Sequence, residues 1–134
     1  MPPVDDPTIG DDVVLWRRLA PSHYILDANE QRIISSAAFK DEELSAFIAS
    51  QTTCEAVLRG YPQHGLVAFT AGDARRVGGP ERPSEGYILV RDPPGDPCHV
   101  LVLPQVKLTK KPRGRQIRRL RDSAIVLIAP QDAP

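Results

Sequence analysis

Residues 65–71 read Gly-Leu-Val-Ala-Phe-Thr-Ala, and this apolar run predicts the clearest strand of the chain. Residues 13–19, Val-Val-Leu-Trp-Arg-Arg-Leu, predict a strand that two arginines interrupt. Residues 33–39, Ile-Ile-Ser-Ser-Ala-Ala-Phe, predict a third strand with two adjacent hydroxyl groups in its middle. Burying such polar groups without partners costs about 1–3 kcal/mol each. These strands therefore either expose one face to solvent or line a polar pocket.

The rest of the chain contains further short elements. Residues 44–50 fit either a strand or a helix by the spacing of their apolar side chains. The other predicted elements are strands at residues 24–26, 86–90, 98–103 and 124–129, helices at 54–59, 73–77 and 116–122, and a loop at 107–115. Helices do not alternate regularly with strands in this order. We therefore expect an α+β fold with about six or seven short strands in a mainly antiparallel or split sheet, and about two or three short helices.

The length and composition are those of a single small domain. With 134 residues, of which 41% are hydrophobic, the chain is long enough to bury a core. We expect the domain to span residues 11–130, with a disordered lead-in at 1–10 and a disordered tail at 131–134. No apolar run approaches the roughly 18 residues needed to cross a bilayer. We therefore expect a soluble, cytoplasmic protein without a membrane partner.

Charge is distributed unevenly along a chain whose formal net charge is zero. Residues 107–121 contain no acidic residue, whereas their basic residues are Lys107, Lys110, Lys111, Arg113, Arg115, Arg118, Arg119 and Arg121. Such a basic patch can bind a nucleic acid or a protein partner. No aromatic residue is interleaved with it, so base stacking is not available there. The alternative is a solvated surface whose charge offsets the acidic amino end.

The cysteines and histidines show no metal-ligand spacing. Cys54 and Cys98 lie in no C-x-x-C motif, so we expect two reduced thiols and no metal site. Among the three histidines, His99 is the best placed to act as a proton donor or base, because it begins a predicted strand.

The paired arginines and paired serines are the other candidates. Neighbouring residues of a strand face opposite ways, so only one of Arg17 and Arg18 can face a pocket, where its fork would suit a phosphate or carboxylate. The alternative is a solvent-facing arginine beside an aspartate. Ser35 and Ser36 either bond a ligand or satisfy backbone groups at a bulge or strand end.

The order of these elements resembles that of small ADP-ribosyltransferase-like domains of the RES type, over about residues 13–77. In that family, an early strand with an arginine precedes a glycine- or serine-bearing segment that ends in an aromatic residue. A further strand and a short helix with a glutamate follow. The corresponding segments here are residues 15–18 (Leu-Trp-Arg-Arg), 35–39 (Ser-Ser-Ala-Ala-Phe), 44–50 (Leu-Ser-Ala-Phe-Ile-Ala-Ser), 53–58 (Thr-Cys-Glu-Ala-Val-Leu) and 66–70.

The resemblance implies NAD as a substrate and a role for several residues. Arg17 or Arg18 would hold the phosphates of NAD, and Ser35 or Ser36 would contact the nicotinamide ribose. Glu55 would be the acid that polarises this ribose. The substrate-binding candidates are then Arg17, Arg18, Ser35, Ser36, Phe39 and Arg75, and the catalytic candidates are Glu55 and His99.

Other interpretations remain open at this point. The whole chain, including Arg91-Asp92-Pro93 followed by His99, is also similar to small bacterial proteins of unassigned function. This likeness implies a single-domain cytoplasmic protein. The alternatives to an NAD-cleaving protein are a non-catalytic interaction module that acts through residues 107–121, and an enzyme of another class that uses His99 with Arg75.

Overall fold

A computed structural model describes residues 2–131 as an α+β domain. Its strands are β1 (Val14–Leu19), β2 (Tyr24–Leu26), β3 (Arg32–Ile34), β4 (Leu44–Ile48), β5 (Gly65–Thr70), β6 (Tyr87–Arg91), β7 (His99–Pro104) and β8 (Ile125–Ile128). Its helices are α1 (Cys54–Leu58), α2 (Ala71–Arg75) and α3 (Lys110–Ser123), with short 3₁₀ turns η1 (Pro21–His23), η2 (Ser36–Phe39), η3 (Ala49–Gln51) and η4 (Pro83–Glu85). The predicted fold class is confirmed.

The main sheet has six strands in the order β6-β7-β4-β1-β5-β8, and every neighbouring pair is antiparallel. β2 and β3 form a separate antiparallel pair. β1 pairs with β5 along its whole length, from Val14 to Leu19. It pairs with β4 only at Leu15 and Trp16, so the sheet opens between β1 and β4 beyond this point.

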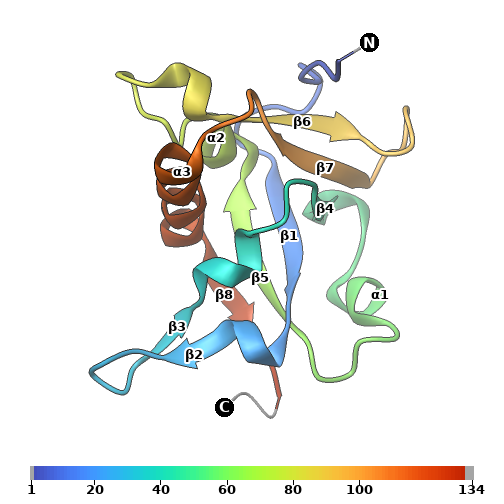
Figure 1. Ribbon diagram of the computed structural model, residues 1–134. Helices are drawn as coiled ribbons and strands as arrows, with labels where there is room; N and C mark the ends of the chain where they lie inside the picture. The colour runs from blue at the N-terminus through green and yellow to red at the C-terminus, as the bar shows by residue number, and fades with distance from the viewer. Residues whose placement is uncertain (1, 132–134) are drawn as a thin grey trace.

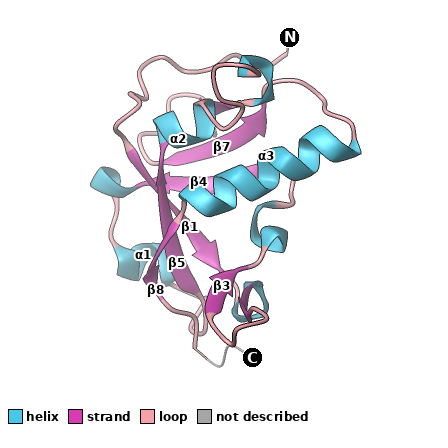
Figure 2. Cartoon of the chain, turned by 90° about the vertical axis from the view of Figure 1, so that its left-hand side faces the viewer, coloured by secondary structure: helices cyan, strands magenta, loops and turns pink. Residues whose placement is uncertain are grey.

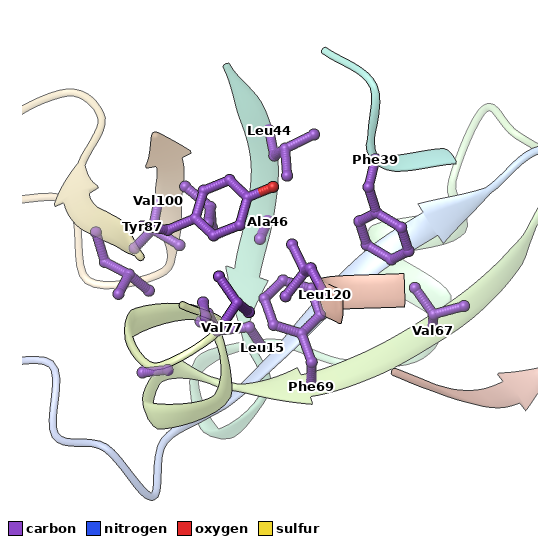
Figure 3. Close-up of a cluster of buried hydrophobic side chains, with 14 of the residues drawn as sticks. Leu15, Phe39, Leu44, Ala46, Val67, Phe69, Val77, Tyr87, Val100 and Leu120 are labelled. Carbon is purple, nitrogen blue, oxygen red and sulfur yellow. The ribbon is translucent and has the colours of Figure 1, made fainter. Parts of the chain in front are cut away.

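One face of the sheet packs against α3, which lies across it in Figure 2. Ile117 and Leu120 of this helix are buried against the sheet. Figure 3 shows Leu120 among the side chains of the core, with Tyr87 and Phe39 on either side of it. Since α3 is amphipathic, its polar face remains outside the core.

The opposite face of the sheet is partly covered by α1, which Figure 1 shows on the far side of the sheet from α3. Thr53 caps this helix by accepting a hydrogen bond from the N–H of Ala56 at 3.1 Å. Val57 of this helix and Leu66 of β5 are both buried. The rest of this face carries the half-buried side chains of the candidate site.

The strand predicted at residues 33–39 is shorter than expected. β3 ends at Ile34, and the 3₁₀ turn η2 follows. The Oγ of Ser35 accepts a hydrogen bond from the N–H of Ala37 at 3.2 Å and so caps the start of the turn. This bond gives the N–H of Ala37 a local acceptor in place of a neighbouring strand. Phe39, which the apolar pattern placed in a strand, is buried as part of the turn η2 instead.

The loop predicted at residues 107–115 is wrong over its second half, because α3 begins at Lys110 rather than at residue 116. Pro112 lies in the first turn of the helix, where backbone N–H groups have no intrahelical acceptor. A proline is therefore tolerated there. Pro112 and Gly114 resemble loop residues in the sequence but lie within the helix.

The amino-terminal segment, for which the sequence predicts disorder, lies along β6. The N–H of Asp6 donates to the carbonyl of Leu89 at 2.8 Å, and the carboxylate of Asp5 accepts from the N–H of Leu89 at 2.9 Å. Ile9 is only 1% exposed. Of the predicted tail, residues 132–134 lie outside the described residues, and Gln131 bonds the carbonyl of Gln63 at 2.9 Å. Among residues 2–131, no helix is both long and apolar enough to cross a membrane.

Candidate functional site

Arg17 and Arg18 point to opposite faces of β1, as their adjacency requires. Arg17 shares the core face with Leu15 and Leu19, and its side chain is 15% exposed. Its Nε donates to the carbonyl of Ala38 at 3.0 Å, and its Nη1 donates to the carbonyl of Ser45 at 2.9 Å. Burial lowers the pKa of Arg17, and the carboxylate of Asp41 offsets part of this effect. Arg17 therefore fills the opening between β1 and β4 and ties η2 to the sheet.

Arg18 lies on the other face, next to α1. Its Nε donates to the carbonyl of Val57 in α1 at 2.7 Å. Its guanidinium carbon lies 4.0 Å from the ring centre of Tyr61 and 5.0 Å from that of Phe47. A cation over two aromatic faces is held in place by their quadrupoles. Only its Nε has a hydrogen-bond partner identified among the described residues, so its outer nitrogens can receive an anion.

His99 lies on the same face as Arg18, with the ring of Phe47 next to both. The imidazole ring centre is 5.3 Å from that of Phe47. Its Nδ1 lies 2.8 Å from the backbone carbonyl of Asp92 and 3.7 Å from a carboxylate oxygen of the same residue. Its Nε2 lies 2.5 Å from the Oγ of Ser45. Because a carbonyl only accepts, Nδ1 of the neutral ring carries the proton and Nε2 accepts from the hydroxyl of Ser45.

The register of three strands produces this arrangement. Trp16 of β1 pairs with Phe47 of β4, and Phe47 pairs with His99 of β7. Residues directly opposite one another in an antiparallel sheet point to the same side. Ser45, two residues before Phe47, therefore also points to this side and lies diagonally across from His99.

A tight turn fixes the start of β7, where His99 lies. The carboxylate of Asp96 accepts from the N–H groups of Cys98 and His99, each at 2.7 Å. These two bonds hold the pKa of Asp96 below its usual value. The turn therefore orients His99 through its backbone, while Asp92 orients the ring.

We call Arg18, Ser45, Phe47, Tyr61 and His99 the Arg18–His99 cluster. It combines a cation, the ring of Phe47, a hydroxyl and an imidazole on one surface of the sheet with the ring of Tyr61 from the segment after α1. An arginine fork suits phosphate oxygens, and aromatic faces suit a heterocyclic base. A neutral imidazole can accept a proton. The cluster therefore has the groups needed to bind a nucleotide and to activate a hydroxyl or a water molecule.

His64 lies next to Tyr61, and the charge of Arg18 affects its protonation. Its ring lies 5.0 Å from that of Tyr61, centre to centre. Burial, then the charge of Arg18 and then that of His23, lower the pKa of His64. These effects favour the neutral form of the His64 imidazole.

The other candidates from the sequence do not join this cluster. Glu55 lies on α1, whose carbonyl binds Arg18, but its side chain is exposed. Ser35 caps η2, and Phe39 is buried in the core on the α3 side. Ser36 faces α3, where it lines a cavity. The serine segment and the glutamate implied by the family resemblance thus lie on opposite sides of the sheet (Figure 1).

Arg75 is held by the amino-terminal segment. Its guanidinium donates to the carboxylates of Asp5 at 3.2 Å and Asp11 at 2.8 Å, and to the carbonyl of Asp6 at 3.0 Å. The carboxylates of Asp11 and Asp5 raise the pKa of Arg75 despite its partial burial. This guanidinium fastens the segment to α2, and it does not contact His99 in the described structure.

The basic side chains of residues 107–121, the basic segment, include some that bond within the domain and some that do not. Several arginines bond within the domain: Arg113 to the hydroxyl of Tyr87 and the side chain of Gln116, Arg115 to Glu85, Arg119 to the carbonyl of Val77, and Arg121 to Asp122. By contrast, Lys110, Lys111 and Arg118 are exposed, and no described carboxylate lies within ion-pair distance of them. The basic segment is therefore partly structural and partly an open surface.

The sequence did not identify Ser45 as a site residue, because the apolar spacing of residues 44–50 fits both a strand and a helix. A strand with Leu44, Ala46 and Ile48 facing inward places Ser45 and Phe47 outward, and this alternation is the signal that could have found it. Its partner His99 is far away in the sequence, so only the sheet order reveals the pair.

Residues 2–131 contain no group of three or more histidine, cysteine, aspartate or glutamate side chains placed to hold a metal ion. The free thiols of Cys54 and Cys98 are both half-buried. Comparison with known proteins finds no matching family model, no matching curated protein and no matching solved structure.

Proposed function

We propose that this protein binds an NAD-class dinucleotide on the Arg18–His99 cluster and hydrolyses the bond between ribose and nicotinamide. One observation supports this proposal above the others. Arg18 and His99 lie on either side of the Phe47 ring, at 5.0 and 5.3 Å, and Ser45 bonds His99 at 2.5 Å. The sequence resemblance to ADP-ribosyltransferase-like domains supplies the substrate class.

In this proposal, each side chain has a defined task. The free nitrogens of Arg18 pair with the diphosphate, and the ring of Tyr61, which is 39% exposed, contacts a base. The glycosidic carbon–nitrogen bond breaks, and its electron pair leaves with nicotinamide. A water molecule adds to the ribose carbon and gives its proton to the Ser45 hydroxyl, which passes its own proton to Nε2 of His99. The products are ADP-ribose, nicotinamide and one proton.

The test is nicotinamide release by the purified protein, followed by chromatography. We expect Arg18→Ala to weaken substrate binding by about ten- to a hundredfold, because one charge-assisted hydrogen bond contributes about 1.5–3 kcal/mol. Removal of the base in His99→Gln should lower turnover by about a hundredfold or more. Arg18→Lys separates charge from geometry, since lysine keeps the charge but loses the fork.

The control is Arg59→Gln, an exposed arginine just after α1, which should leave release unchanged. Glu55→Gln distinguishes two versions of the proposal. Loss of release in this variant would assign the acid to Glu55, as the resemblance implies, and unchanged release would leave His99 as the base. Absence of both release and a thermal shift with NAD or ADP-ribose would overturn the proposal.

A further inference from the structure

A cavity of 250 Å³ lies between α3 and the 3₁₀ turn η2, on the face of the domain away from the Arg18–His99 cluster. This cavity, which we call the α3 groove, is lined by Ser36, Ala37, Lys40, Gly114, Ile117 and Arg118. Two cationic side chains and a hydroxyl thus surround a floor that includes Ala37 and Gly114.

The glycine in this floor lies next to a cation. A Cβ at Gly114 would lie 3.0 Å from Nη1 of Arg118, so this guanidinium would have to shift by a few tenths of an ångström. Glycine within a helix is less favourable than alanine. The helix nevertheless has glycine at this point, and the guanidinium of Arg118 lies beside it.

The open cations extend from the groove along one side of α3. Lys110 and Lys111 lie one turn before Gly114, and Arg118 lies one turn after it. Lys40 comes from the opposite wall. All four side chains are in exposed residues. Three exposed acidic residues, Asp41, Glu42 and Glu43, follow Lys40 directly in the chain, and the last two line a second cavity, of 310 Å³.

We propose that this surface, formed by Lys40, Lys110, Lys111 and Arg118, binds the phosphate backbone of a nucleic acid. The proposal is independent of the nucleotide site on the opposite face. From residue 110 to 118 the helix rises about 12 Å, because each residue adds 1.5 Å. Phosphates of one strand follow each other about every 3.4 Å along a duplex axis, so about three or four lie within this length.

The same observations argue against a membrane or a protein as the partner. A membrane-surface helix buries its apolar side in lipid, whereas Ile117 and Leu120 of α3 are already buried in the core. A protein interface is usually centred on aromatic or large apolar anchors. The α3 groove offers only Ile117 as a large apolar group. Cations without aromatic neighbours suit sequence-independent contact with phosphates.

The test is fluorescence anisotropy of a labelled duplex of about 20 base pairs, titrated with the full chain over a range of salt concentrations. About three to four phosphate contacts predict a slope of log K against log salt of about −3. Affinity should then fall about 60-fold between about 50 and 200 mM NaCl. An unrelated duplex sequence should bind equally well.

Variants locate the contact. Arg118→Gln should reduce the slope by about 1, so that affinity falls only about 15-fold over the same salt range. Arg59→Gln removes the same charge from the α1 side and should leave the slope unchanged. Lys111→Glu, an exposed charge reversal, should weaken binding further. Arg118→Gln and Lys111→Glu should both keep normal nicotinamide release, because the cationic surface and the Arg18–His99 cluster lie on opposite sides of the sheet.

Three results would overturn the proposal. The first is no duplex binding at the lowest salt concentration. The second is binding whose slope is the same in Arg118→Gln as in the unaltered chain. The third is tighter binding to vesicles of phosphatidylcholine and phosphatidylserine, or to polyglutamate, than to the duplex.

Discussion

At the scale of single residues, two adjacent arginines of β1 have different roles. Arg17 donates to the carbonyls of Ala38 and Ser45 inside the opening of the sheet. Arg18 lies over two aromatic rings on the outer face and leaves nitrogens available for a ligand. The sequence predicted that only one of the two would face a site. In the structure, Arg17 bonds two carbonyls, whereas Arg18 bonds one carbonyl through Nε and keeps its outer nitrogens available.

Replacing Arg17 should destabilise the fold. In Arg17→Met, two half-buried carbonyls lose a charged donor, so we expect the free energy of unfolding to fall by about 2–4 kcal/mol. Arg17→Lys should recover only part of this loss, because an ammonium group cannot reproduce the planar fork. Urea unfolding followed by circular dichroism measures both. Arg59→Met is the exposed control, with an expected change below about 0.5 kcal/mol. A loss in Arg17→Met no larger than in this control would contradict the role.

At the scale of elements, local signals explain several departures from the predicted boundaries. α2 begins at Ala71 rather than at residue 73, because Thr70 and Asp73 form a capping box. The hydroxyl of Thr70 accepts from the N–H of Asp73 at 3.0 Å, and the carboxylate of Asp73 accepts from the N–H of Thr70 at 3.3 Å. The pattern Thr-x-x-Asp was readable in the sequence. By contrast, helical structure at Pro112 depends on its place in the first turn of α3.

The capping box predicts a moderate and specific effect. Thr70→Ala should lower the free energy of unfolding by about 1 kcal/mol, because an N–H at the helix start loses its acceptor. Thr70→Ser keeps the hydroxyl and should restore most of the stability. Thermal and urea unfolding of both variants check this. Equal losses in the two variants would show that the methyl group, rather than the cap, is responsible.

At the scale of the whole molecule, the amino-terminal segment is part of the domain. It connects the edge strand β6 with α2 through ion pairs of Asp5, Asp6 and Asp11 with Arg75, Arg76 and Arg91. Thr8 and Arg91 hold the pKa of Asp6 below its usual value. The prolines and aspartates of this segment suggested disorder. The arginines that bind these aspartates lie more than sixty residues away in the sequence, so the local pattern does not reveal the ion pairs.

The buried side chain of this segment allows a direct test. Ile9→Ala should cost about 2–5 kcal/mol, because it leaves a cavity beside the core. Val4→Ala is the matched control, since Val4 is 73% exposed and should change stability by less than about 0.5 kcal/mol. Urea unfolding at constant pH measures the difference. Equal stability of the two variants would mean that Ile9 contributes no packing.

The sequence by itself determined the class of the fold and the positions of most strands. Apolar alternation and turn residues act locally, so β1, β5, β6, β7 and β8 could be predicted within one or two residues. It also singled out the Arg17–Arg18 pair and His99 as separate candidates. These signals need no knowledge of which strands become neighbours.

Only the tertiary structure decided which candidates meet. The order β7-β4-β1 brings His99, Phe47 and Trp16 into register. The same order separates Arg18 from Ser36, which α3 and η2 place on the other face. The α3 groove likewise depends on the fold, because Lys40 and Arg118, which line it together, are far apart in the sequence. Strand order and face are set by burial of the whole core, which no local stretch of sequence encodes.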